Sequence, residues 1–330
     1  MTTDGYTYPR PPDSERTESV RTAGGPGCSG GWTRRSLAVC LVIALCSGCT
    51  LHPDKEGAEN HPPAIMKGAE PLPIDRGRDR ACLLLHGFGS SPADFGPLPE
   101  MLDEAGWDVY APLLPGHGTE PEDLARVTAS EVYGAARGHY RELRDRYDRV
   151  ALGGFSMGGC IATGLAVDEP PDRLLLVSPY YAIRYHWYYV LPPRWWNYLL
   201  SPVVWWVPVT SQVNRPGGES ELVHYDWLPT KGVRMLFALR DGVLERTEGK
   251  RLRCPVLLIY STGDNTASSG AMEDVLGRLT DGGYWPARFT DSNHHVLHDY
   301  DREEALRAAL EFMQGPPPSE GGGPADSVPQ

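Results

Sequence analysis

Gly153-Gly154-Phe155-Ser156-Met157-Gly158-Gly159 is the stretch that decides the fold. The apolar run Arg149-Val150-Ala151-Leu152 leads into it, and a small-residue run from Cys160 to Ala166 leads out. This order predicts a strand, a sharp turn and a helix. A G-x-S-x-G sequence at such a turn is typical of a nucleophile elbow, whose glycines permit the strained turn that lifts a serine hydroxyl off the sheet. Ser156 is therefore the candidate nucleophile; the alternative is a glycine-rich turn in which Ser156 only caps the helix.

The chain is long enough to bury a large core. It has 330 residues, 41% of them hydrophobic, and its formal net charge is −12. Once the ends are discounted, this length suits one large α/β domain or such a domain with an insertion. The negative charge argues against a nucleic-acid partner and indicates a solvated acidic surface.

Residues 1–49 are expected to be a leader. Residues 1–33 lack apolar periodicity, and Arg34-Arg35 precede an apolar run at 36–45 that is too short for a lasting membrane span. Cys46-Ser47-Gly48-Cys49 resembles a bacterial lipobox, although the motif prefers leucine where Cys46 stands. The resemblance implies lipid on Cys49 and an exported lipoprotein on the outer face of a bacterial membrane. The alternatives are a plain signal peptide with secretion, or a start codon assigned too far upstream, which would leave a cytoplasmic protein.

Two more segments are expected outside the globular core. Residues 50–67 are polar and contain proline, which suits a tether, and residues 315–330 form a tail rich in glycine and proline that should be disordered. Only Cys82, Cys160 and Cys254 remain for the core, and an odd number argues against a disulfide framework. We interpret them as small buried hydrophobes without metal-ligand spacing, so no metal or other cofactor is expected.

Short apolar runs alternate with helical patterns between these ends. Strands are predicted at 81–86, 108–111, 150–152, 173–177, 255–260 and 287–289, and helices at about 98–105, 130–147, 157–168, 270–280 and 301–313. Near-continuous hydrophobic runs separated by helices are typical of a parallel sheet covered on both faces. The pattern predicts an α/β fold with a mostly parallel sheet.

Leu85-His86-Gly87-Phe88-Gly89-Ser90-Ser91 follows the first core strand, where a glycine-rich exit can aim a backbone N–H at a neighbouring site. With the Ser156 elbow and Pro115-Gly116-His117-Gly118, it resembles the carboxylesterase and monoacylglycerol lipase branch of the α/β-hydrolases, over about residues 80–313. The resemblance implies an α/β-hydrolase sheet of about six to seven strands, with a core at 68–179 and 233–314 and an inserted helical cap at 180–232. It also implies that the amides of Phe88 and Met157 form an oxyanion hole, and that His86 and His117 brace loops.

The same resemblance places an acid after the serine and a histidine after the acid. Asp264 stands just past the strand 255–260, where the family keeps its acid. Three other carboxylates occupy less suitable places: Asp241, Asp274 and Asp291. In Ser292-Asn293-His294-His295-Val296-Leu297, the family pattern of a small residue and then His-Val matches His295. We therefore expect His295 to take the proton of Ser156, Asp264 to orient His295, and His294 to lie at the surface or behind the site.

Six of the nine tryptophans lie between Val177 and Cys254. The resemblance places the cap in this interval and implies that its aromatic side chains shape an acyl pocket. The candidates are Trp187, Trp195, Trp196, Trp205 and Trp206. The alternatives are that most of them pack the cap against the core or lie at a membrane interface.

The resemblance thus implies a serine hydrolase that cleaves carboxylic esters through an acyl-enzyme, with a small acyl ester or a lipid as substrate. A thioesterase, amidase or peptidase remains open, because acyl-transfer machinery does not specify the leaving group. So does a non-catalytic member of the fold that binds acyl ligands, and the oligomeric state stays open as well.

Overall fold

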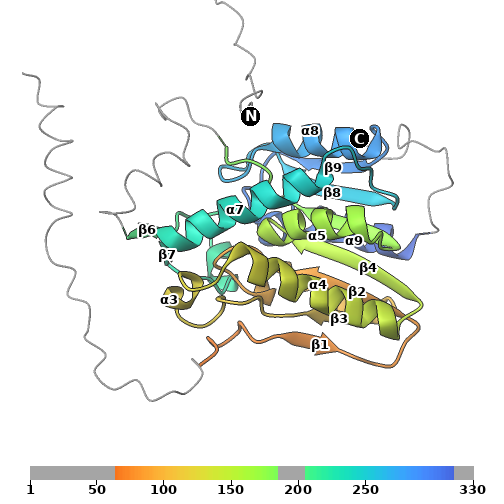
Figure 1. Cartoon of the computed structure of the whole chain (residues 1–330), viewed down its shortest axis with the longest axis horizontal. Helices are drawn as coiled ribbons and strands as arrows, with labels where there is room; N and C mark the ends of the chain where they lie inside the picture. Colours follow the sequence, from red (N-terminus) through yellow and green to blue (C-terminus); the bar gives the residue numbers. More distant parts are fainter. Residues whose placement is uncertain (1–63, 185–204, 316–330) are drawn as a thin grey trace, which may run out of the picture. The chain divides into compact units, whose positions relative to one another are not determined.

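The computed structural model describes residues 64–184 and 205–315 (Figure 1). These residues lie within one compact unit of the chain, Pro62–Gln330. The leader with Cys49, most of the predicted tether, Trp187, Trp195, Trp196 and the tail lie outside the described residues, so the predictions made for them stay predictions.

Seven strands form one sheet in the order β1-β3-β2-β4-β5-β8-β9. The parallel strands are β2 (Arg80–Leu85), β3 (Asp108–Ala111), β4 (Arg149–Phe155), β5 (Arg173–Val177), β8 (Val256–Ser261) and β9 (Trp285–Phe289). The edge strand β1 (Leu72–Ile74) pairs with β3 in the antiparallel direction. The predicted mostly parallel sheet is confirmed, whereas β1 was not predicted because three half-exposed residues show no periodicity.

Helices cover both faces of the sheet (Figure 1). Those packed in the larger core cluster are α4 (Ala129–Arg146), α5 (Met157–Asp168), α7 (Thr230–Thr247) and α8 (Ser269–Thr280). Those in the other cluster are α2 (Leu98–Glu104) and α9 (Arg302–Gln314). The short helices are α3 (Pro121–Leu124), η1 (Pro92–Phe95), η2 (Gly218–Glu221) and η3 (Val296–His298). The five predicted helices are found within a residue or two of their expected bounds.

Strand β2 shows why the central strands are continuously apolar. Ala81, Leu83 and Leu85 contribute to the cluster under α4 and α5, and Cys82 and Leu84 to the cluster under α2 and α9. Since side chains alternate along a strand, both faces must be apolar when helices cover both. The apolar runs therefore mark the strands whose carboxyl ends carry the site.

The interval between β5 and β8 departs most from the prediction. Within its described residues, β6 (Trp206–Pro208) and β7 (Trp227–Pro229) form a two-stranded antiparallel ribbon, with η2 between them. Only α7, which starts at Thr230, gives the described part of 180–232 a regular α-helix. Buried Met235, Leu239 and Val243 stand four residues apart and are the signal that could have predicted α7.

Candidate active site

The strand-to-helix turn at Ser156 has the strain that its sequence predicts. Ser156 lies between β4 and α5 with φ 50° and ψ −112°, a conformation that non-glycine residues rarely adopt. A Cβ on Gly154 would stand 2.3 Å from the carbonyl oxygen of Gly158, and one on Gly158 would stand 1.8 Å from that of Leu85. Both flanking glycines are therefore required by close backbone contacts.

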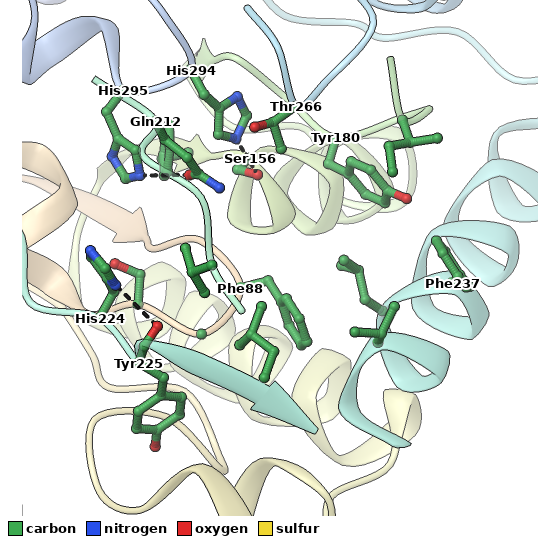
Figure 2. Close-up of a pocket in the computed structure, with 18 of the residues that line it drawn as sticks. Phe88, Ser156, Tyr180, Gln212, His224, Tyr225, Phe237, Thr266, His294 and His295 are labelled. Carbon is green, nitrogen blue, oxygen red and sulfur yellow. Dashed lines mark hydrogen bonds between the residues drawn. The ribbon is translucent and has the colours of Figure 1, made fainter. Parts of the chain in front are cut away.

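A hydrogen-bonded chain runs from Ser156 through His294 to Asp264, and Figure 2 shows its bond between Ser156 and His294. His294 Nε2 lies 2.9 Å from Ser156 Oγ, and His294 Nδ1 lies 2.7 Å from Asp264 Oδ2. A carboxylate only accepts, so Nδ1 carries the proton and Nε2 is free to accept from the serine hydroxyl. All three side chains are buried, with 8% of Ser156 exposed and 1% each of His294 and Asp264. The predicted positions of Ser156 and Asp264 fit this chain.

The prediction that His295 is the base is wrong, because His294 makes both hydrogen bonds. His295 packs against Phe155, with ring centroids 4.4 Å apart, and its Nε2 is 3.1 Å from Gln212 Oε1. Adjacent residues of an irregular loop point in different directions, so a shift of one residue decides which imidazole faces Ser156. The family pattern of a small residue followed by His-Val matches His295. Because two histidines stand side by side, the sequence does not determine which of them faces the serine.

Backbone amides and a guanidinium hold Asp264 in place. Its Oδ1 accepts hydrogen bonds from the amides of Thr266 and Ala267 at 2.7 and 2.8 Å, which leaves Oδ2 for His294. Asn293 Oδ1 accepts from the amides of Asn265 and His294, and so ties the acid loop to the histidine loop. The side chain of Arg184 donates to the carbonyl of Asp264. The acid is thus fixed by contacts that follow from its place just after β8.

The loop after β2 carries Phe88, the predicted oxyanion donor. Phe88 and Ser156 line the same cavity. Among the described residues the amide of Phe88 has no backbone or side-chain acceptor, and Met157 is the first residue of α5, where an amide lacks an intrahelical acceptor. Both are therefore available to a ligand.

Two buried histidines brace this loop, as predicted. His86 Nε2 accepts from the amide of Leu114 at 3.0 Å, and its Nδ1 lies 2.8 Å from the carbonyl of Gly87. His117 Nδ1 lies 2.9 Å from the carbonyl of Pro115, and its ring packs edge-on against His86. Burial lowers the pKa of His86 to about 3 and that of His117 to about 4, so both are neutral at pH 7.

The serine opens into a cavity of about 180 Å³ with two unlike halves (Figure 2). The apolar half has α7 on one side and includes Tyr180 and Phe237, and Ile183, Leu228 and Leu236 also line the cavity. The polar half includes Gln212, Glu219, His224 and His295. Such a site can take an apolar chain on one side of the serine and a hydroxylated group on the other.

The predicted pocket tryptophans that the structure describes do not line this cavity. Trp205 is 66% exposed, and Trp206 pairs with Pro229 in the ribbon; neither is among its lining residues. Phe88, Tyr180, Tyr225 and Phe237 supply the aromatic walls instead. The prediction is wrong for Trp205 and Trp206.

Within residues 64–184 and 205–315, no cluster of three His, Cys, Asp or Glu residues has metal-binding geometry. Cys82 and Cys160 are buried thiols and Cys254 is half-buried; none is in a disulfide. Over the same residues, no helix has the length and apolar character needed to span a bilayer.

The α/β-hydrolase class is defined by a strained serine at a strand-to-helix turn of a mostly parallel sheet. In this chain a histidine links that serine to a buried aspartate, and all three lie at the ends of the strands. The chain belongs to the α/β-hydrolase family described as serine aminopeptidase, S33, whose model matches residues 77–301.

Two named proteins are similar to this chain in sequence. The chain is 28% identical over 264 residues to a thermostable monoacylglycerol lipase of Bacillus sp. (strain H-257), covering 78% of this chain and 98% of the relative. It is 35% identical over 107 residues to a carboxylesterase of Bacillus subtilis (strain 168), covering 32% of this chain and 44% of the relative.

Solved structures share the fold. A structure from work on LipS and LipT, two metagenome-derived lipolytic enzymes, matches with a TM-score of 0.64 and 25% identity, covering 76% of this chain and 99% of that one. A monoacylglycerol lipase of Paleococcus ferrophilus matches with a TM-score of 0.61 and 20% identity, covering 74% and 97%. At that lower identity the likeness supports the fold alone.

Proposed function

We propose that this protein is a serine hydrolase of carboxylic esters, with Ser156 as nucleophile, His294 as base and Asp264 as the acid that orients it. The observation that carries the proposal is the hydrogen-bonded chain from Ser156 Oγ to His294 and Asp264 at the wall of an apolar cavity. The relatives named as lipase and esterase agree with this chemistry.

The arrangement of these groups supports acyl transfer in the following steps. His294 Nε2 accepts the proton as Ser156 Oγ attacks the ester carbonyl, and Asp264 stabilises the imidazolium through Nδ1–H. The amides of Phe88 and Met157 receive the tetrahedral oxyanion. Collapse breaks the bond to the alcohol oxygen, which takes the proton from His294. Water then attacks the acyl-enzyme by the same sequence, and the acid product leaves.

The two halves of the cavity indicate the kind of ester. Its apolar half, with Leu236 and Phe237, suits the chain of an acyl group, and the polar half, with Gln212 and His224, suits an alcohol that keeps free hydroxyls. Esters of a fatty acid with a small polyol, such as monoacylglycerols, fit this division, and the relative named as a monoacylglycerol lipase supports it. Two hydrogen-bonding side chains in this half contact each other, since Glu219 lies 3.1 Å from His224 Nε2; the carboxylate of Glu219 also accepts from Ser211 Oγ at 2.8 Å.

The test is a substrate panel on the purified protein. It compares monoacylglycerols and p-nitrophenyl esters of graded chain length with matched acyl thioesters and with amino-acid p-nitroanilides, which probe the activity in the family's name. We expect the esters to give the highest kcat/KM, and an active-site fluorophosphonate to label Ser156. Faster turnover of thioesters or anilides would assign a different leaving group, and no labelling of Ser156 would contradict the proposal.

We also propose that the mature protein is held at a membrane by lipid on Cys49. The support is the sequence alone: a short apolar run followed by Ser47-Gly48-Cys49. The full chain expressed in a bacterium should incorporate labelled palmitate and sediment with membranes, and Cys49→Ser should do neither, because it removes the thiol that would carry the lipid. Wild-type protein that is unlabelled and soluble would contradict this proposal.

A further inference from the structure

A buried carboxylate that the acyl-transfer steps do not use lies behind the loop after β2. Asp94 belongs to η1 and is 1% exposed. Its Oδ2 accepts the amide of Gly87 at 2.7 Å, and its Oδ1 accepts the hydroxyl of Ser90 at 2.5 Å. Gly87 and Ser90 flank Phe88 and Gly89, so one carboxylate holds both sides of the segment that presents the Phe88 amide.

The histidine loop closes round the same carboxylate from the other side. His295 Nδ1 lies 3.7 Å from Asp94 Oδ1, and His298 Nε2 donates to the carbonyls of Ala93 and Asp94 at 3.0 and 3.1 Å. The rings of His294 and His295 both pack against Phe155, with centroid distances of 5.0 and 4.4 Å. Asp94 therefore lies where the Phe88 loop and the loop of the base meet.

The backbone of this loop is packed directly on Asp94. A Cβ on Gly87 would stand 2.9 Å from the ring of Phe155 and 3.2 Å from Asp94 Oδ2, so the backbone there is packed directly on both. Burial raises the pKa of Asp94 to about 6, because the charged form is desolvated. An acid in this place is costly, and an apolar residue would leave the buried amide of Gly87 without an acceptor.

We propose that Asp94 is a positioning residue for the oxyanion hole: its carboxylate fixes Gly87 and Ser90 so that the Phe88 amide points at the developing oxyanion. The inference rests on the proposed function, because it takes Phe88 as an oxyanion donor. It assigns to Asp94 a role in the rate of acyl transfer and none in binding the acyl chain.

The main test is Asp94→Asn, which keeps the shape of the side chain and replaces one acceptor oxygen by an NH₂ group that cannot accept. The amide oxygen can then accept from Gly87 N–H, but the NH₂ group can only donate to Ser90 Oγ, so the charged acceptor of both bonds is lost and the Ser90 hydroxyl must reverse its role. Misplacing a catalytic group by about 1 Å costs on the order of 100-fold, so we expect kcat to fall about 10- to 100-fold with KM changed less than about threefold. Asp79→Asn is the matched control, since Asp79 is an exposed carboxylate paired with Arg149.

A pair of ketone inhibitors separates positioning from general damage. An alkyl trifluoromethyl ketone is attacked by Ser156 Oγ while His294 takes the proton, and the resulting alkoxide occupies the oxyanion hole. The matched alkyl methyl ketone occupies the pocket with little addition. Asp94→Asn should lose about 10- to 100-fold in affinity for the trifluoromethyl ketone and less than about twofold for the methyl ketone. An equal loss for both would overturn the proposal, as would wild-type affinity for both.

Ser90→Ala is a second variant that tests the same proposal if Asp94→Asn does not fold. It removes the hydroxyl bonded to Oδ1 and leaves the bond from Gly87 to Oδ2. It should show a smaller loss in the same direction, about three- to tenfold for the trifluoromethyl ketone only. A wild-type inhibitor ratio in folded Ser90→Ala would count against the proposal. If the wild-type protein neither hydrolyses esters nor binds the trifluoromethyl ketone, the proposed function itself has failed, which is a distinct outcome.

Discussion

The loops at the carboxyl ends of the strands and the interval between β5 and α7 shape the same cavity in different ways. The strand-end loops fix Ser156, Asp264 and His294 through short hydrogen bonds to buried backbone. The interval contributes side chains such as Gln212, His224 and Leu228 from short irregular segments and a two-stranded ribbon. We expect changes in the first region to alter the rate of reaction and changes in the second to alter the choice of substrate.

The largest effect should come from the strand-end loops, at Ser156. Ser156→Ala removes the nucleophile and opens no sizeable cavity, so ester hydrolysis should fall by about 10⁴- to 10⁶-fold while the melting temperature stays close to that of the wild type. Steady-state kinetics and a thermal melt measure both. Turnover near the wild-type level would show that Ser156 is not the nucleophile.

The two adjacent histidines allow a comparison of two residues within one strand-end loop. His294→Gln should lower kcat by at least about 10³-fold, because it removes the base between Ser156 and Asp264. His295→Gln should keep at least about a tenth of the activity, since His295 contacts Gln212 and lies near Asp94. Each variant is the control for the other, measured with one ester under the same conditions. Reversed results would mean that the loop register in the structure is off by one residue.

The apolar and polar halves of the cavity test substrate choice. Phe237→Ala should move the preferred acyl chain towards longer esters by about 10- to 100-fold in relative kcat/KM, because each methylene in an apolar pocket is worth about 1–3 kcal/mol. Gln212→Ala should leave that profile and lower the preference for monoacylglycerols over simple alkyl esters by about tenfold. Trp205→Ala, at an exposed side chain, is the control and should change neither. An altered chain-length profile in Trp205→Ala would show that Trp205 does help to select the acyl chain.

The smallest effect concerns stability in acid, which depends on the buried histidines behind the strand-end loops. The pKa values of His86 and His117 are lowered to about 3 and about 4, and burial lowers that of His295 well below its usual value. The unfolded chain takes up these protons below pH 6.5, so the free energy of unfolding should fall as the pH drops from about 6.5 to about 4. Asp94 opposes this in part, because its raised pKa lets the folded state bind a proton below about pH 6.

Urea melts between pH 4 and 7 measure this slope. His117→Asn should reduce it by up to about 1 kcal/mol per pH unit, since one fewer proton is taken up on unfolding. His139→Asn, at an exposed position, should leave the slope unchanged. An unchanged slope in His117→Asn would show that His117 does not stay neutral in the folded protein.

The sequence by itself determined the sheet, the elbow and the order of the chemical groups. Apolar runs mark strands that are buried on both faces, and the glycines around Ser156 are dictated by backbone contacts of 2.3 and 1.8 Å, so both leave a local signal. Asp264 was found because an acid just after a central strand is a local feature too. These elements depend on residues close together in the chain.

Only the tertiary structure decided which histidine faces Ser156, what lines the cavity and what lies behind the Phe88 loop. His294 and His295 are chemically identical and adjacent, and the direction of each ring depends on contacts with Asp264 and Gln212, which are 30 and 83 residues away. Phe237 reaches the cavity because α7 packs on α5, whereas Trp205, just before strand β6, is exposed. Asp94 meets the histidine loop across about 200 residues of sequence, as its carbonyl contact with His298 shows (|i−j| = 204). Side-chain direction in loops is set by such distant contacts, and a pattern of neighbouring residues does not contain them.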